Sequence, residues 1–207
     1  MANPSDRLVW IDCEMTGLDL DLDELIEVAV IVTDSELNIL DDGLTVVIKP
    51  SAAALDNMSD FVRAMHEKSG LLEELDDGMT LADAEYAINE YVISHVPVEG
   101  QAPLAGNSIA TDRAFLTKHM PRVDKHLHYR NVDVSSIKEL ARRWYPRIYF
   151  NAPEKGGDHR AKNDILESIR ELQYYRGTAF VPDPGPSTVE ARLVATQVVA
   201  DFPASLR

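Results

Sequence analysis

Two carboxylates at the end of a buried strand constrain the fold of this chain more than any other feature. The apolar run at residues 8–11 predicts a strand without a polar face, and Asp12 and Glu14 follow it directly. Because side chains alternate along a strand, Asp12 and Glu14 point to the same side, about 7 Å apart. An apolar strand that ends in acidic residues is typical of an open α/β sheet, which places its site at the carboxyl ends of its strands.

The order of the remaining elements indicates how that sheet is built. Strands are predicted over residues 8–11, 26–33, 43–50, 103–106 and 129–134. Helices are predicted over residues 56–66 (as short pieces), 81–95, 111–119, 135–144 and 159–175. Short turns join the first three strands, so they form an antiparallel meander. The prediction is an α/β fold, with a mixed sheet whose antiparallel edge strands come first and whose faces are flanked by helices.

The length of 207 residues suits one domain with a sizeable core. We expect that domain to span residues 1–180. The stretch from 177 to 187 is rich in proline and glycine, so residues 181–207 are expected to be a mobile linker and a C-terminal tail. Within this tail, residues 188–200 could form an amphipathic helix that docks loosely on the domain.

Composition and charge limit the partners and the compartment. The net charge of −15 argues against a broad electrostatic grip on long nucleic acid, although residues 111–176 carry a net charge of +5. That basic segment suits a short anionic ligand, while acidity that only maintains solubility is the plain alternative. No apolar run approaches the roughly 18 residues of a membrane helix, and the N-terminus lacks a signal-peptide pattern. With its single cysteine, the chain is expected in the cytoplasm, away from membranes.

Three further residues extend the acidic pair into a candidate catalytic centre. Asp112 follows the apolar segment at residues 103–106, and His159 and Asp164 stand at the start of the last long helical pattern. Carboxylate oxygens are hard ligands that suit Mg²⁺ or Mn²⁺ rather than zinc. The four acids supply enough negative charge for two such ions, a type of site that activates water and stabilises a leaving oxygen. His159 would accept the proton of that water as a general base.

Each of these residues also has a simpler interpretation. An Asp-x-Glu sequence is common on protein surfaces, and His159 could only cap the helix that it begins. Asp112 could only complement the dipole at a helix N-terminus. Cys13 lies between two candidate ligands and points to the opposite face, so we interpret it as buried packing. The order of the motifs, an acidic pair after a first strand and His-x4-Asp at a late helix, favours the metal site.

The motifs resemble those of the DEDDh superfamily of 3′→5′ exonucleases, named for its four acids and its histidine. Within this superfamily, residues from about 8 to 180 resemble the oligoribonuclease family. The most specific stretches are residues 10–18, 106–109, 129–135, 159–161 and 164–172. The resemblance implies a ribonuclease-H-like fold, a homodimer, and hydrolysis of very short RNAs, especially dinucleotides, to mononucleotides. It assigns Asp12, Glu14, Asp112 and Asp164 to two metal ions and His159 to the general base.

The same resemblance implies that the substrate-binding site is closed at one end, where the 5′ phosphate lies. Ser108, Arg130 and Ser135 would hold the 5′ phosphate of a dinucleotide, where arginine gives bidentate bonds and hydroxyls complete the cradle. A terminal phosphate at a fixed distance from the scissile bond favours the shortest substrate. Alternatively, Arg130 could be an ion-pair partner and Ser135 an N-cap. Lys138, where the family often has a hydroxyl, could contact phosphate or be a surface residue.

Three other positions complete the substrate contacts that the resemblance implies. Leu18 would wedge between the two bases, His66 would lie near the substrate, and Tyr129 would reach the site of the neighbouring subunit. An ordinary exposed leucine and a tyrosine packed in the core are the alternatives for Leu18 and Tyr129.

These observations together predict a 3′→5′ exoribonuclease that acts on short RNA and not on long duplexes. The nearest rival is another DEDDh exonuclease, one that proofreads DNA or trims RNA 3′ ends, although longer substrates usually need a basic track. A non-catalytic nucleotide-binding scaffold is a rival of another class, but a binder has no need of a general base. Whether the cellular substrates are RNA decay products or signalling dinucleotides stays open, as do the preferred metal and base.

Overall fold

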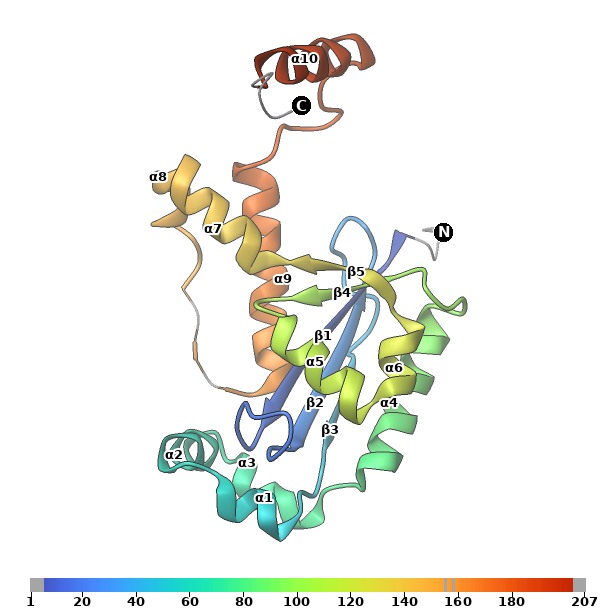
Figure 1. Ribbon diagram of the computed structural model, residues 1–207, viewed down its shortest axis with the longest axis vertical. Helices are drawn as coiled ribbons and strands as arrows, with labels where there is room; N and C mark the ends of the chain where they lie inside the picture. Colours follow the sequence, from blue (N-terminus) through green and yellow to red (C-terminus); the bar gives the residue numbers. More distant parts are fainter. Residues whose placement is uncertain (1–5, 155, 158, 203–207) are drawn as a thin grey trace.

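Five strands form one mixed sheet in the computed structural model, which describes the chain except for residues 1–5, 155, 158 and 203–207 (Figure 1). The strands are β1 (Leu8–Met15), β2 (Leu25–Thr33), β3 (Leu44–Val47), β4 (Pro103–Gly106) and β5 (His128–Asp133). Their order is β3-β2-β1-β4-β5. The pairs β1–β2 and β2–β3 are antiparallel, whereas β1–β4 and β4–β5 are parallel. The predicted mixed sheet with antiparallel strands first is therefore confirmed.

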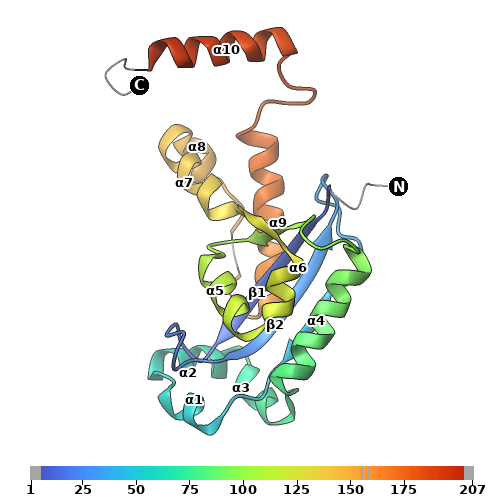
Figure 2. The same ribbon diagram turned by 45° about the vertical axis from the view of Figure 1, so that its right-hand side comes forward.

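Side-chain alternation along β1 divides the core into two layers. Val9, Ile11 and Cys13 face a cluster with residues of α4 (Leu81–His95), α5 (Ala110–His119) and α6 (Pro121–His126). Trp10 faces the other side, toward α7 (Val134–Trp144) and α9 (Ala161–Thr178). Figures 1 and 2 show the sheet between these two groups of helices. Asp12 and Glu14 share the face of Trp10, so they face α9.

Short helices close the end of the sheet where β1 terminates. They are α1 (Ala52–Asn57), α2 (Asp60–Lys68), α3 (Leu71–Glu74) and a 3-10 helix (Leu75–Asp77). Serine side chains cap α1 and α2, as expected for short helices that begin after polar residues. These helices pack through a small apolar cluster around Ile26 and Leu71. They bring α2 and α3 next to the start of α9 (Figure 1).

Several boundaries differ from those predicted. Helix α9 begins at Ala161, two residues later than expected, because His159 and Arg160 have non-helical backbone angles. Pro121 and Pro146 were expected only to end helices, but each also occupies the first turn of a new one, α6 and α8 (Pro146–Tyr149). The expected short pieces over residues 56–66 are α1 and α2. Strand β1 is longer and β3 shorter than predicted.

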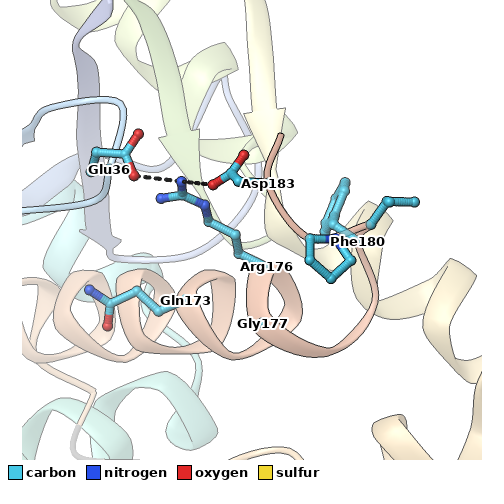
Figure 3. A pocket seen from close by; sticks show the side chains of 8 residues that line it. Glu36, Gln173, Arg176, Gly177, Phe180 and Asp183 are labelled. Atoms are coloured by element: carbon cyan, nitrogen blue, oxygen red, sulfur yellow. Dashed lines mark hydrogen bonds and ion pairs between the residues drawn. The ribbon is translucent and has the colours of Figure 1, made fainter. Parts of the chain in front are cut away.

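The chain beyond α9 leaves the domain. Arg176 lies near the end of α9 and pairs with Glu36 at 2.5 Å and with Asp183 at 3.6 Å, beside a hollow also lined by Phe180 (Figure 3). Helix α10 (Thr188–Asp201) then stands apart from the sheet in both views (Figures 1 and 2). All of its residues are exposed.

The prediction of a docked, amphipathic terminal helix is only partly correct. The helix forms, with a capping box between Ser187 and Glu190, but its apolar side chains do not gather on one face. They are exposed rather than packed on the domain: Val189, Leu193, Val194, Val198 and Val199. Among the described residues, no helix has the length and apolar character needed to cross a membrane.

Candidate active site

Three carboxylates from distant parts of the sequence meet at the end of β1. Asp12 and Glu14 come from β1, and Asp164 comes from the first turn of α9. One oxygen of each lies within 4.8 Å of the others. The packing of α9 against β1 and β2 brings Asp164 to this place, as the motif order suggested.

Asp112 lies beside this group and also accepts a hydrogen bond from the backbone of β1. It stands in the first turn of α5, is only 8% exposed, and its Oδ1 accepts a hydrogen bond of 3.0 Å from the backbone N–H of Cys13. That bond joins Asp112 to the strand between Asp12 and Glu14. The close group of oxygens therefore contains three of the four predicted acids, with Asp112 adjacent.

Burial and mutual repulsion make these acids hard to ionise. Burial, followed by the charges of Asp112, Asp164 and Glu14, raises the pKa of Asp12 well above its usual value. Burial and Asp164 raise the pKa of Glu14 from 4.5 to about 8, and burial raises that of Asp112 to about 6. Buried carboxylates in such a group repel one another unless a cation lies between them. The hard oxygen donors and their crowding fit a divalent cation such as Mg²⁺ or Mn²⁺.

Two of the predicted site residues are histidines. His159 is exposed, precedes α9 with a φ of +49°, and lies close enough to His66 to contribute to the electrostatics of that ring. His66 is fully buried; its Nε2 donates to the carbonyl of Met15 at 2.9 Å, and its Nδ1 lies 3.9 Å from Glu14. Burial lowers the pKa of His66, which favours the neutral ring. The alternative that His159 only caps α9 is wrong, because the N-cap residue is Arg160.

Glu27 is a functional candidate that the sequence analysis missed. It is fully buried on β2, lies opposite Glu14 in the strand register, and binds the guanidinium of Arg160. A single charged residue in the apolar run of residues 26–33 was the available signal, because a buried charge needs a partner.

A hydroxyl cluster lies where β4 and β5 end. The Oγ atoms of Ser108 and Ser135 are 3.0 Å apart, and both backbone N–H groups donate to Asp133 Oδ1. Ser135 also donates to Asn107, whose amide donates to Ser168 and to the buried Glu171. Asp133, not Ser135, is the N-cap of α7, so the capping alternative for Ser135 is wrong.

The other predicted substrate contacts lie on the surface. Leu18 is 74% exposed in the loop after β1. Tyr129 is 75% exposed on the edge strand β5, so the core-packing alternative is wrong. The guanidinium of Arg130 lies 5.5 Å from the Tyr129 ring centre and forms no ion pair with the described residues. Lys138 pairs with Glu171 at 3.1 Å.

Comparison with known proteins agrees with this geometry. The RNase_T family model, described as an exonuclease, matches residues 9–172. The oligoribonuclease of Leifsonia xyli is 64% identical over 206 residues, with complete coverage of both chains. The oligoribonuclease of Streptomyces coelicolor is 62% identical and covers 94% of this chain and 98% of its own.

Solved structures share the fold at low sequence identity. The zinc-bound complex of E. coli exonuclease I with single-stranded DNA has a TM-score of 0.65 and 15% identity. It covers 94% of this chain, which spans only 43% of that exonuclease chain. The family model and the full-length relatives, rather than this structural likeness, identify the branch. The chain belongs to the exonuclease family, and within it to the oligoribonucleases.

Proposed function

We propose that this enzyme hydrolyses short oligoribonucleotides, especially dinucleotides, from the 3′ end to 5′-mononucleotides, with two Mg²⁺ or Mn²⁺ ions in each site. The observation that carries the proposal is the grouping of Asp12, Glu14 and Asp164 within 4.8 Å. Asp112 is the fourth ligand in this proposal, since its charge acts on Asp12 and Glu14. When bound, such ions polarise the attacking water and stabilise the leaving oxygen.

The protein residues divide the remaining work. His159, exposed just before the helix that carries Asp164, accepts the proton of the attacking water. Water oxygen bonds to phosphorus, the bond from phosphorus to the 3′ oxygen breaks, and that oxygen leaves with a proton from solvent. Leu18 wedges between the two bases, and His66, whose ring lies 3.9 Å from Glu14, is near the substrate. The proposed roles of Leu18 and His66 do not depend on a basic surface along a longer nucleic-acid strand.

The preference for a dinucleotide would come from the hydroxyl cluster. Ser108 and Ser135 are already held 3.0 Å apart, so rotation of their hydroxyls would let both donate hydrogen bonds to a 5′ phosphate. The guanidinium of Arg130 lacks an ion-pair partner among the described residues, which leaves it available for that phosphate. In a longer RNA, further nucleotides are attached to this phosphate, so it is no longer terminal.

We further propose that the enzyme acts as a homodimer in the cytoplasm. Tyr129, exposed on the edge strand, would extend into the site of the partner subunit. The net charge of −15 suits this choice of short substrates over long duplexes.

A time course with 5′-labelled RNA tests the function. A dinucleotide and a 20-mer are compared in Mg²⁺ and in Mn²⁺, with EDTA as the control. We expect much faster cleavage of the dinucleotide, abolished by EDTA. Equal or faster cleavage of the 20-mer would move the protein to the general exonucleases, and a lack of cleavage would favour the non-catalytic scaffold.

A further inference from the structure

A buried carboxylate on β2 stands next to the metal site without belonging to it. Glu27 is fully buried and lies directly opposite Glu14 in the antiparallel register of β1 and β2. Cross-strand partners share one face of the sheet, where two like charges repel each other. Such an arrangement needs a cation close to Glu27.

Arg160 supplies that cation and joins two elements. Its Nε and Nη2 donate to Glu27 Oε1 at 3.0 and 2.7 Å. Its Nη1 and Nη2 donate to the two carboxylate oxygens of Glu74, at the end of α3, at 2.8 and 3.1 Å. The guanidinium is thus held from two sides, a geometry that a lysine cannot reproduce. We call Glu27, Arg160 and Glu74 the arginine clamp.

Glu27 also fixes the backbone at the start of α9. Its second oxygen accepts a hydrogen bond of 2.8 Å from the N–H of Ala161, the first residue of the helix. Arg160, the N-cap residue, offers no side-chain cap of its own. A carboxylate from β2 therefore does the work of an N-cap, and one residue holds both the Arg160 side chain and the Ala161 backbone.

His159 depends on this anchorage. It is the next residue toward the N-terminus, it is exposed, and its φ of +49° lies in a region that side-chain-bearing residues rarely adopt. Its ring makes no hydrogen bond with another described residue. Among the described residues, the covalent link to the clamped Arg160 therefore restrains the backbone that carries this ring.

We propose that Arg160 is a positioning residue: by anchoring the backbone next to His159, the arginine clamp holds the imidazole where it can accept a proton from the attacking water. The inference rests on the proposed function, in which His159 is the general base. Arg160 touches neither water nor substrate in this role. The alternative is that the clamp only stabilises the fold or lowers the repulsion within the acidic group.

A double-mutant cycle separates these roles. Arg160→Lys, His159→Ala and the double variant are compared with the wild type for kcat on a 5′-labelled dinucleotide. Arg160→Lys retains the charge but loses the fork of hydrogen bonds, and we expect kcat to fall about 10- to 100-fold, the effect of a misplaced catalytic group. In the His159→Ala background the same change should cost less than about twofold, because no base is left to misplace.

Two measurements control for folding and for metal binding. Arg176→Lys makes the same substitution in an exposed pair at the other end of α9, with Glu36, and should leave kcat unchanged. Mn²⁺ affinity of Arg160→Lys should stay close to that of the wild type, and its thermal midpoint should stay above the assay temperature. An equal loss of kcat in both backgrounds, or a parallel loss of Mn²⁺ affinity, would overturn the proposal.

The pH dependence decides the matter if His159→Ala is too slow to measure. Solvent hydroxide can replace a misplaced base, so the deficit of Arg160→Lys should narrow as the pH rises. A deficit that stays constant with pH would contradict the positioning role. If the wild-type enzyme itself fails to cleave dinucleotides, the proposed function fails first, which is a different result.

Discussion

Asp112 is held by a backbone hydrogen bond as well as by its place near the other acids. In Asp112→Asn, the side-chain oxygen can still accept the N–H of Cys13, so the fold should persist while the negative charge is lost. We expect cleavage of a dinucleotide in Mg²⁺ to fall about 10²-fold or more, since metal binding is worth several kcal/mol to such reactions. Rate measurements together with a thermal midpoint near that of the wild type would verify this. Metal-dependent cleavage left intact would contradict the metal site.

The protonation of Glu14 should make the stability of the metal-free protein depend on pH between mildly acidic and neutral conditions. Its pKa rises from 4.5 to about 8 on folding because of burial and Asp164, so between roughly pH 5 and pH 8 the folded state binds more protons than the unfolded state. The free energy of unfolding therefore falls as the pH rises through this window. Melting in EDTA and in Mg²⁺ measures the effect, and Mg²⁺ should offset the fall.

Glu14→Gln provides the matched control for this pH dependence. Glutamine does not ionise, so the melting midpoint of this variant in EDTA should fall less steeply with pH than that of the wild type. An identical slope in both proteins would assign the effect to other groups.

At the scale of elements, the sheet and the long helices could be predicted because their signals are local. The apolar runs of β1 and β2 and the helical spacing from Ile165 to Tyr175 stand in the sequence itself. The start of α9 could not be predicted, because its cap comes from Glu27, 134 residues earlier. The helices α6 and α8 were missed because a proline ends one helix and begins the next.

The candidate site also divides into features that the sequence could predict and features that it could not. Asp12, Glu14 and Asp164 could be proposed to meet because the fold type places strand ends and late helices together. The bond from Cys13 to Asp112, the pairing of Ser108 with Ser135, and the arginine clamp depend on side-chain positions that no periodicity encodes. The exposed state of α10 was missed for a related reason, since helix propensity does not reveal whether a helix has a surface to pack on.

Removal of residues 181–207 should leave the main domain intact. Every described residue of α10 is exposed, and the pair between Arg176 and Asp183 is an exposed one of small value. We expect the melting midpoint to change by less than about 2 °C, as for other surface changes, with dinucleotide cleavage retained. Leu172→Ala, in the core, should instead lower the free energy of unfolding by about 2–5 kcal/mol. A large destabilisation by the truncation would mean that the tail belongs to the folding unit.

At the scale of the whole molecule, the proposed dimer can be tested by complementation between subunits. Tyr129→Ala should impair the partner's site, whereas Asp112→Asn impairs the site of its own chain. A heterodimer purified with two different tags would then contain one intact site. It should show about half of the wild-type rate, although each parent homodimer is slow. A rate no higher than the mean of the parents would place Tyr129 in its own subunit's site or outside any site.

The burial of Cys13 has a practical consequence for the study of this molecule. Its thiol is the only one in the chain, and burial and the neighbouring acids raise its pKa, so it is unreactive under ordinary labelling conditions. A cysteine introduced on the exposed surface of α10, for example at Val198, would therefore be the only site to take up a fluorophore or spin label. Distances between the terminal helix and the catalytic domain could therefore be measured with pairs of introduced cysteines, without first removing a natural one.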